Sequence, residues 1–480
     1  MTRDQFDKVM SYAKEFGEPA PLFLSHRDHI FNPCVEVSLC PILIKTPDGK
    51  ILQDYSLDVL NNRSELISKG WTFESGFQAC NLTELNASRF TSEDDFRKAV
   101  WAGAVIGTLQ AGYTDAGYLG EVTQQIIERE ALLGVSMTGM MDNPEVAFDF
   151  ELQKQMAEYA IAINKEVASL ININSAARVT VVKPAGNSSV LLRTSSGIHA
   201  QHSRRYIRRV QVNKDDPVYQ YFNTINPHMS EPSVWSTNKT DDVISFPIEV
   251  SSDAILKDDL SALSFLDMVR QTQENWVLCG TARPDSCEGL VHNVSNTIDI
   301  LPGEWDKVSD YIWDFMDSFG GLSFLGKAGD YIYQQAPMQK IVFENQLVQE
   351  FGSANVGAAK HIIRHITERY GSLHMIMRPL QMILNGHSSA VAVKGTVVHT
   401  ELLWDTYKKI RQLMNVNGVD EVIYLLASIG HEDKWRSLTL DMEAVDYSGL
   451  IESQDNTETE QTVACGGGAC DLSYTLPMNQ

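Results

Sequence analysis

The run Arg178-Val-Thr-Val-Val182 is rich in β-branched residues and leads into a Gly/Ser-rich turn, a pattern typical of a buried strand. The segment before it predicts a helix, because its apolar residues recur at spacings of three and four. A second strand-like stretch, Gly134-Val-Ser-Met-Thr-Gly139, follows an earlier helical segment. Helices that alternate with short apolar strands indicate an α/β fold with parallel strands. The apolar stripe of the predicted helix consists of Leu152, Met156, Tyr159, Ile163, Val167 and Leu170.

The first hundred residues predict shorter elements. Residues 1–30 read as a helix followed by a proline-containing stretch, which together form an N-terminal extension too short to be a domain. Residues 31–90 are loop and strand, and Leu43–Leu52 predicts a hairpin because Pro-Asp-Gly supplies its turn. A helix is expected to begin near Thr91, where Thr-Ser-Glu-Asp resembles a capping box.

The C-terminal part of the chain has a different character. Residues 344–440 predict helices at Ala358–Arg369 and Leu402–Met414 around a strand at Ala390–Val393, and they contain no chemical motif. Residues 441–464 are acidic and polar, which is typical of a flexible tether. We therefore divide the chain into an N-terminal extension, a main α/β part, an inserted module and a flexible tail, which comprise residues 1–30, 31–343, 344–440 and 441–480.

The composition is that of an ordinary globular protein, with 480 residues of which 43% are hydrophobic and 21% charged. There is no long apolar run, and the first 25 residues mix charged with apolar residues. We therefore expect neither a transmembrane span nor a signal peptide, and a cytoplasmic location. The net charge of −23 disfavours nucleic-acid binding. It allows a small phosphorylated ligand, which needs only a local group of donors.

The seven cysteines do not suggest a secreted disulfide framework, because their number is odd and the protein is large. Cys465 and Cys470 enclose Gly-Gly-Gly-Ala at the end of the acidic tether. The glycines allow the two sulfurs to meet, and the tether allows the pair to reach a site elsewhere in the protein. The pair predicts a redox shuttle. The alternative is half of a zinc site, although no second Cys or His pair lies nearby in the sequence.

Asn32-Pro33-Cys34-Val35-Glu36 places an amide and a carboxylate within a few residues of a thiol. A neighbouring carboxylate raises the pKa of a thiol, so Cys34 is a poor thiolate nucleophile. The arrangement suits a thiol that donates and accepts hydrogen atoms while Glu36 handles a proton. Taken alone, the same residues are equally compatible with an ordinary turn that holds a buried cysteine.

Three further groups of residues are weaker candidates. Pro184-Ala-Gly-Asn-Ser-Ser189 predicts a phosphate loop, because Gly186 permits close backbone approach and the next three residues offer donors; a plain capped helix start is the alternative. Ser203–Arg209 is a basic cluster that suits nucleotide phosphates, although clustered arginines are more often solvated or paired. Cys279 is expected in the core, Cys40 is as suited to packing as to reaction, and Cys287 has no special context. The phosphate-loop candidates are Pro184, Gly186, Asn187, Ser188 and Ser189.

With Phe77-Gln-Ala-Cys-Asn-Leu82 added, the ordered motifs resemble those of the ribonucleotide reductases, and most of all the monomeric, adenosylcobalamin-dependent class II ribonucleoside-triphosphate reductases. The resemblance covers about residues 30–340 and 445–475. Asn187 departs from it, because the family usually has Thr or Ser there. The further matching motifs are Gly134–Gly139, Val182–Ser189, Ser195–His199, Gly321–Leu325 and Gln335–Pro337.

This resemblance implies a ten-stranded α/β barrel with a finger loop through its centre, of which residues 31–343 would be the second half. Cys34 would become a thiyl radical at the fingertip and remove the 3′ hydrogen of a ribonucleotide. Glu36 would take the proton of the 3′-OH, Asn32 would bind the ribose hydroxyls, and Cys80 would be one of two reducing thiols. Cys465 and Cys470 would re-reduce the resulting disulfide and be recharged by thioredoxin or a similar reductant.

The first half-barrel has no counterpart in this sequence, so either a separate chain supplies it together with the partner thiol of Cys80, or the protein is inactive. We expect a separate chain, because the finger, Cys80, loop and tail motifs are all present. The segment between Cys34 and Cys80 is longer than is usual in the family. A class I radical relay would need two adjacent tyrosines, but the tyrosines of Asp330-Tyr-Ile-Tyr333 are separated by one residue. The sequence also shows no glycyl-radical loop of the kind that class III enzymes need. Adenosylcobalamin is therefore the expected cofactor, and triphosphates are the expected substrates. Two alternatives remain: a class I-like large subunit served by a metal-containing partner, and a non-catalytic zinc-binding protein.

Overall fold

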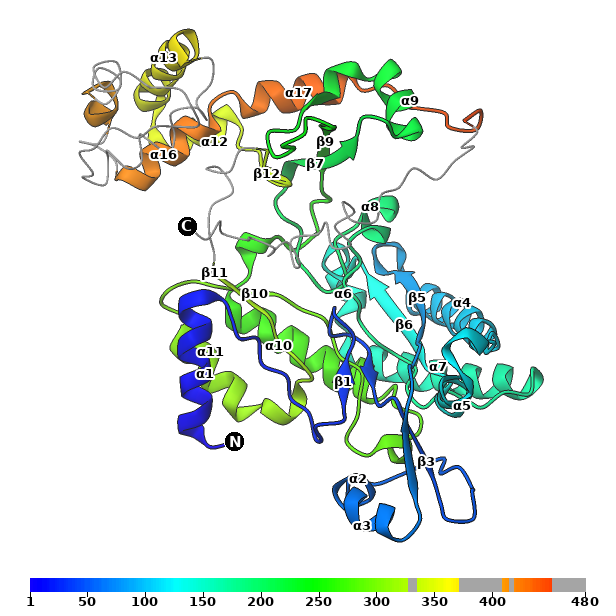
Figure 1. Ribbon diagram of the computed structural model, residues 1–480. Helices are drawn as coiled ribbons and strands as arrows, with labels where there is room; N and C mark the ends of the chain where they lie inside the picture. The colour runs from blue at the N-terminus through cyan, green and yellow to red at the C-terminus, as the bar shows by residue number, and fades with distance from the viewer. Residues whose placement is uncertain (327–334, 371–407, 414–417, 451–480) are drawn as a thin grey trace. The chain divides into compact units, whose positions relative to one another are not determined.

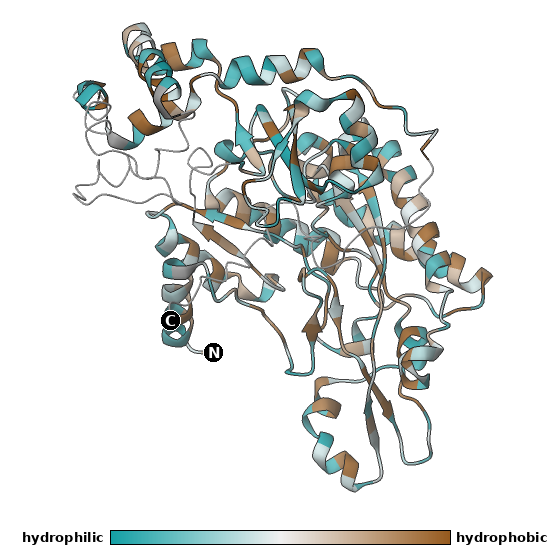
Figure 2. Ribbon diagram, turned by 45° about the horizontal axis from the view of Figure 1, so that its top comes forward, coloured by the Kyte–Doolittle hydropathy of each residue, from teal (hydrophilic) through white to brown (hydrophobic). Residues whose placement is uncertain are grey.

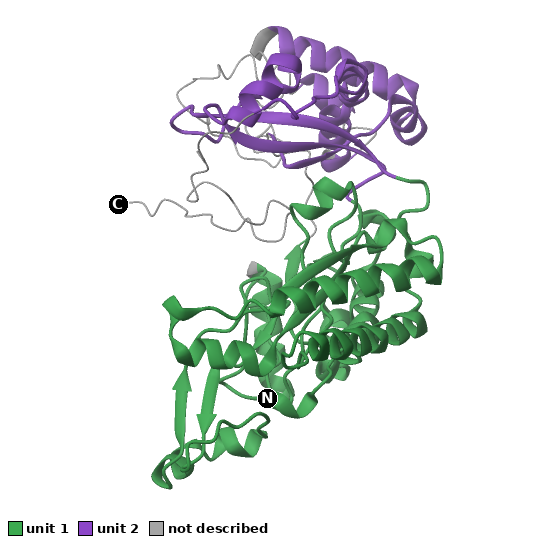
Figure 3. Ribbon diagram, turned by 90° about the vertical axis from the view of Figure 1, so that its right-hand side faces the viewer, with its two compact units in different colours: residues 1–201, 251–327, 464–480 green, residues 202–250, 328–463 purple. Residues whose placement is uncertain are grey.

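The computed structural model describes residues 1–326, 335–370, 408–413 and 418–450 (Figure 1). The chain forms two compact units (Figure 3). The first unit contains Met1–Gln201 and a segment that begins at Ser251 and continues through strand β11 (Phe324–Gly326). The second contains His202–Val250 and the described residues from Gln335 onward. The chain therefore leaves the first unit after Gln201 and returns to it at Ser251.

Parallel strands lie at the centre of the first unit. β5 (Asn81–Asn86) and β6 (Leu133–Thr138) pair in parallel along their whole length. The predicted strand Arg178–Val182 lies parallel to β6 on its other side, and Val182 pairs in parallel with Val294. Every residue of β6 is buried, as expected for a strand covered on both faces. The α/β class predicted from the sequence is confirmed, and no closed barrel is found among the described residues.

Two long helices cover this sheet. α4 (Glu93–Ala111) begins one residue later than a cap at Thr91 would give, because the side chain of Ser92 accepts the hydrogen bond from the Asp95 N–H. α4 packs closely on β5, since a β-carbon at Gly103 would lie only 2.8 Å from Leu85 Cδ2. Close contact at this position therefore requires glycine.

α7 (Phe150–Leu170) is the helix predicted from the apolar stripe. Met156 and Ile163 are buried, and the intermediate positions of the stripe pack against the same core. Leu170 is an exception, because 76% of it is exposed at the end of the helix. Hydrophobic and hydrophilic residues both occur on the helices, as expected for amphipathic elements (Figure 2).

The remaining elements of the first unit complete its core. α1 (Arg3–Phe16) contributes Phe6 and Met10 to it, so the N-terminal extension packs into this unit. β10 (Ile298–Ile300) pairs in parallel with β11. The other helices of this unit are α2 (Leu57–Asn61), α3 (Arg63–Ser68), α5 (Glu121–Glu130), α6 (Pro144–Ala147), α8 (Ser188–Leu192), α10 (Ala262–Thr272) and α11 (Trp305–Asp314).

Two hairpins precede β5. β1 (Ile30–Phe31) pairs antiparallel with β2 (Ser38–Leu39), and we call the segment from Ile30 to Leu39 the finger hairpin. The predicted hairpin Leu43–Leu52 is present, because Lys45 pairs antiparallel with Ile51. Its first strand, β3 (Ile42–Lys45), has a longer antiparallel partner that sequence reasoning did not find, β4 (Thr72–Ser75).

The second unit is built on an antiparallel sheet with the strand order β12-β7-β9-β8. β7 (Arg205–Asn213) and β9 (Asp241–Glu249) pair over their full length. Apolar residues of this sheet pack against Trp435 and Leu438 of α17 (His431–Asp441). The other elements are β8 (Ser230–Pro232), β12 (Met338–Lys340), α9 (Pro217–Ile225), α12 (Glu344–Phe351), α13 (Ser353–Tyr370) and α16 (Val419–Ser428).

The two units divide the chain differently from the sequence-based division. Residues 202–250, assigned there to the main α/β part, belong with residues of the 344–440 module. α13 agrees with the helix expected at Ala358–Arg369. The predicted strand Ala390–Val393, most of Leu402–Met414 and the tail from residue 451 lie outside the described residues. No helix in the described ranges has the length and hydrophobicity needed to span a membrane.

Candidate active site

The finger hairpin presents Cys34 at its tip. Asn32 closes the loop, since its Oδ1 accepts hydrogen bonds from the backbone N–H groups of Glu36, at 3.1 Å, and Val37, at 2.9 Å. The Val35 N–H also donates to the Asn32 carbonyl, at 2.9 Å. The resemblance predicts that Asn32 binds the ribose, but here its side-chain oxygen holds the loop together. The Cys34 side chain is half-buried.

One segment of the first unit anchors the tip of this loop. The Ser295 hydroxyl donates to the Cys34 carbonyl at 2.8 Å, and the Asn293 side chain donates to the Val35 carbonyl at 2.9 Å. The Asn293 N–H donates to the Glu36 carbonyl, also at 2.9 Å. Val35 itself has φ of +61°, a strained conformation for a β-branched residue. These contacts hold Cys34 and Glu36 through their backbone carbonyls.

Glu36 is buried, with only 4% of its surface exposed. Its Oε2 has no hydrogen-bond partner among the described residues. Burial raises the pKa of Glu36, and the hydrogen bond to Asn32 and the positive charge of Lys183 offset only part of that effect. A carboxyl group with a raised pKa and an unused oxygen is suited to accept and return a proton.

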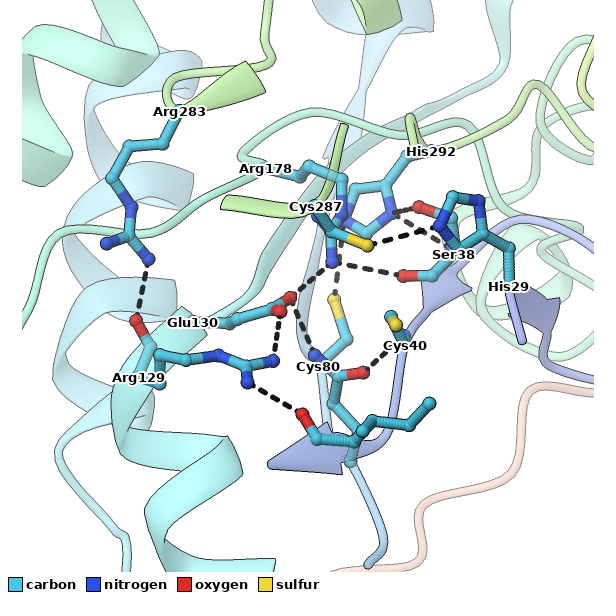
Figure 4. Close-up of polar contacts among 12 residues, drawn as sticks. His29, Ser38, Cys40, Cys80, Arg129, Glu130, Arg178, Arg283, Cys287 and His292 are labelled. Carbon is cyan, nitrogen blue, oxygen red and sulfur yellow. Dashed lines mark hydrogen bonds and ion pairs between the residues drawn. The ribbon is translucent and has the colours of Figure 1, made fainter. Parts of the chain in front are cut away.

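Cys80 lies at the start of β5, and its Sγ is 4.0 Å from His292 Nε2 (Figure 4). The Ser38 N–H donates to His292 Nδ1 at 3.1 Å, so the ring proton is on Nε2, 3.0 Å from the Leu133 carbonyl. Burial lowers the pKa of His292 to about 3, so this ring is neutral. Burial also raises the pKa of Cys80, and the charge of Glu36 acts in the same direction. Cys80 is therefore a neutral thiol.

Glu84 and Lys183 join these groups, and the sequence analysis did not identify them. Lys183 Nζ lies 3.4 Å from Glu84 Oε2, and both side chains are largely buried. The charge of Lys183 also acts on Glu36 of the finger hairpin and lowers its pKa. Two sequence signals were available. Glu84 lies four residues after Cys80, so in a strand the two side chains would lie on the same face. Lys183 directly follows the predicted strand Arg178–Val182, at the end where ligands bind in parallel α/β sheets.

The predicted phosphate loop is held mainly by contacts within the protein. The Ser188 hydroxyl donates to Glu84, which brings this loop to β5. The Ser189 N–H donates to the Ala185 carbonyl at 3.0 Å, and the Ser189 hydroxyl lies 3.5 Å from the Gly186 carbonyl. Asn187 stands at the start of α8 and forms no side-chain cap. Pro184 and Gly186 therefore precede a short helix without a side-chain cap, and its Ser188 hydroxyl reaches the candidate site through Glu84.

The basic cluster Ser203–Arg209 lies in the second unit, largely in β7. Arg205 forms an ion pair with Glu249 at 2.6 Å, and its guanidinium lies 4.6 Å from the Phe343 ring centre. Arg209 donates to the Ala336 carbonyl at 3.0 Å. These arginines have partners within their own unit. Cys465 and Cys470 lie outside the described residues.

A buried ion network lies beneath the finger hairpin (Figure 4). Glu130 accepts hydrogen bonds from Arg129 and Arg178, each at 2.5 Å, and all three side chains are at most 1% exposed. Arg129 also donates to the Ile42 carbonyl at 2.7 Å, and Arg178 lies 3.5 Å from the Ser38 carbonyl. Burial alone would raise the pKa of Glu130, but the two arginines keep it below its ordinary value. The network fixes the strand that leaves the hairpin.

We expect Gly321→Ala to displace the finger hairpin. A β-carbon at Gly321 would lie 2.6 Å from Val35 Cγ1 and 2.9 Å from Leu22 Cδ2, so the loop must shift. The free energy of unfolding should fall by about 1–3 kcal/mol, the usual cost of overpacking. Urea denaturation measures it. Gly326→Ala is the matched control, because no atom lies within 4 Å of its added carbon. Equal stability of the two variants would contradict this account of the loop.

The structure of this chain resembles a solved structure of a known class of fold. A crystal structure of a B12-dependent, class II ribonucleotide reductase superimposes with a TM-score of 0.51 and 17% sequence identity, over 72% of this chain and 48% of that chain. At this identity, the likeness concerns the fold. It supports an α/β fold of the ribonucleotide reductase type. No family model matches the sequence.

The sequence of this chain is also similar to parts of curated proteins that share one name. An adenosylcobalamin-dependent ribonucleoside-triphosphate reductase of Lactobacillus gasseri is 23% identical over 167 residues, which are 29% of this chain and 22% of that protein. A probable enzyme of the same name from Dictyostelium discoideum is 22% identical over 281 residues, 56% of this chain and 34% of that protein. The resemblance drawn from the motifs is thus confirmed, and adenosylcobalamin is the cofactor in the names of these relatives. The matched region spans at most about a third of each relative.

Proposed function

We propose that this chain carries the radical cysteine and the second half of the barrel of an adenosylcobalamin-dependent ribonucleotide reductase that acts on ribonucleoside triphosphates. The observation that carries the proposal is the buried Glu36 carboxyl. It has an unused oxygen, lies two residues from the Cys34 thiol, and is close enough to Cys80 for its charge to act on that thiol. A radical thiol, a proton acceptor and one of the two reducing thiols are groups that removal of a 2′-hydroxyl needs; the other reducing thiol would come from a separate chain.

Cys34 is suited to receive a radical from the cofactor. Its thiol stands at the tip of a loop whose backbone is fixed by Ser295 and Asn293, and it is half-buried rather than enclosed. Bound adenosylcobalamin would supply the radical through homolysis of its cobalt–carbon bond. Cys34 would then hold the unpaired electron on its sulfur, remove the 3′ hydrogen atom of the ribose, and return it after reduction.

Glu36 and Cys80 would carry the proton and the reducing electrons. The raised pKa of Glu36 suits a group that takes the 3′-OH proton and can give it back. Cys80 would provide a hydrogen and an electron as water leaves the 2′ position, and would finish in a disulfide with a second thiol. Because Cys80 is neutral, it is suited to donate hydrogen and does not attack the substrate as a thiolate.

Ser188 and Lys183 would position the substrate. Lys183 is a cation whose charge acts on the Glu36 carboxyl, and its ion pair with Glu84 holds it on β5. Ser188 donates to the same carboxylate, so the loop from Pro184 to Ser189 would bring its glycine and its backbone donors to the nucleotide phosphates. We propose that a separate chain supplies the first half-barrel with the partner thiol of Cys80. Cys465 and Cys470 would re-reduce the disulfide and be recharged by a thioredoxin-like protein.

The test combines the full chain with the chain that carries the first half-barrel, a ribonucleoside triphosphate, a dithiol reductant and adenosylcobalamin. Deoxynucleotide should form only when both chains and the cofactor are present, as measured by chromatography of the nucleotides. Dependence on iron or manganese in place of cobalamin would favour the class I-like alternative. Absence of product under all these conditions would contradict the proposal.

A further inference from the structure

A second cluster of reactive side chains lies at the base of the finger hairpin. It consists of His29, Cys40 and Cys287, all of which are buried (Figure 4). One ring nitrogen and the two sulfurs lie within 4.8 Å of one another, and His29 Nε2 is 3.2 Å from Cys287 Sγ. Among the described residues, no other group of His, Cys, Asp and Glu side chains meets this criterion. The roles proposed above do not use any of the three.

A single ion bound to these three residues would connect both ends of the finger hairpin to the short helix Pro284–Cys287. His29 immediately precedes β1, and Cys40 immediately follows β2, so they flank the two ends of the finger hairpin. Cys287 ends the short helix Pro284–Cys287, far along the chain. This cluster is therefore distinct from the Cys80 thiol, whose neighbour is His292.

The donor set is that of a zinc-class ion. Two thiolates and one imidazole are the ligands that tetrahedral zinc prefers, with about 2.3 Å to sulfur and about 2.0 Å to nitrogen. Sulfur and nitrogen ligands at those distances lie about 3–4 Å from one another, which agrees with the observed 3.2 Å between His29 and Cys287. Tyr55 is a candidate for the fourth position, because its hydroxyl is 3.4 Å from Cys40 Sγ.

Two arginine side chains lie near this cluster. Arg129 contacts the Tyr55 hydroxyl at 3.2 Å, and Arg178 lies on the other side of Glu130. These cations stabilise negative charge on sulfur. A divalent ion with two thiolates adds no net charge to a site already occupied by two arginines and one glutamate.

We propose that His29, Cys40 and Cys287 bind one zinc-class divalent ion, which fastens both ends of the finger hairpin to the turn at Cys287. The ion would have a structural role. It would hold the base of the loop whose tip is already anchored by Asn293 and Ser295, and so restrict how far Cys34 can move. The proposal does not depend on the reaction proposed for Cys34.

The full chain, purified after expression with added zinc, should contain about one zinc per molecule by plasma mass spectrometry. Cys287→Ala should reduce this content at least fivefold. Cys279→Ala is the matched control and should retain the metal, because that half-buried thiol donates to the Glu274 carbonyl, at 3.4 Å, and does not belong to the cluster. A double variant, Cys465→Ser with Cys470→Ser, should also retain it, which separates this site from the tail.

Cobalt substitution gives a readout that does not depend on how well Cys287→Ala folds. The cobalt(II) form of the unaltered chain should show thiolate-to-cobalt charge-transfer absorption, and its intensity should fall by about half in Cys40→Ser, which keeps one thiolate. Three results would overturn the proposal: less than about 0.2 zinc per chain, full metal content in Cys287→Ala with loss in the tail variant, or a Cys40–Cys287 disulfide in the native protein.

Discussion

Replacing Cys34 with alanine is expected to abolish deoxynucleotide formation and to leave nucleotide binding intact. Alanine has no hydrogen that a cofactor-derived radical can exchange readily, so the rate should fall by at least about 1,000-fold. The loop should keep its structure, because Ser295 and Asn293 bind the carbonyls of Cys34 and Val35 and not their side chains. Product chromatography and equilibrium dialysis with the nucleotide measure the two quantities separately.

Cys279→Ala is the control for this experiment as well. Cys279 is also a half-buried thiol of the first unit, and it packs at the edge of the core. Its removal should change the rate by no more than about threefold. If Cys34→Ala turned over nucleotides at the normal rate, Cys34 would not be the radical residue. If it failed to bind nucleotide as well, the loss of activity would have to be attributed to the structure of the loop.

Glu130→Gln is expected to destabilise the first unit by about 3–5 kcal/mol, the usual result of removing one partner from a buried ion network. The substitution leaves Arg129 and Arg178 in a dry environment with no carboxylate to balance them. Urea denaturation at neutral pH measures the change. Glu128→Gln is the matched control on the same helix, because Glu128 is exposed and its carboxylate accepts a hydrogen bond from the Gln124 side chain. It should cost less than about 0.5 kcal/mol.

The same pair of variants should respond differently to acid. The pKa of Glu130 is lower in the folded protein than in the unfolded chain, so its contribution to stability is fully present at neutral pH. That contribution is lost as the pH falls below the ordinary carboxyl range and then through the lowered pKa. The stability difference between the unaltered protein and Glu130→Gln should therefore shrink at low pH. A difference that stayed constant, or that matched Glu128→Gln, would contradict the role assigned to the network.

Local sequence patterns predicted the parts of this structure that depend on neighbouring residues. The alternation of helix with short apolar strand predicted β6 and α7, and the Asn32–Glu36 motif predicted the loop that carries Cys34. These features follow from backbone preferences and from chemistry within a few residues. The error at Leu170 arose at a helix end, where periodicity continues but the packing partner does not.

Contacts between distant residues could not be predicted in the same way. His292 meets Cys80 across 212 positions, and Cys287 meets His29 across 258, so no local spacing reports them. Nothing in the local sequence indicated that Glu130 is buried, since a glutamate near the end of a helix is usually solvated. Its charge is balanced in the interior by Arg178, a residue that the local pattern identifies only as the start of a strand. Pairs of this kind depend on which strands become neighbours.

The order in which the second unit is synthesised has a consequence for its folding. β7 and β9 leave the ribosome together and can pair at once, but the helix that carries Trp435 and Leu438 follows almost two hundred positions later. Until then, Ile207, Ile244 and Phe222 lack part of their apolar cover. A nascent chain that pauses before α17 would thus expose a hydrophobic face of the sheet, which promotes aggregation with other chains. A chaperone that covers this face would raise the yield of native protein.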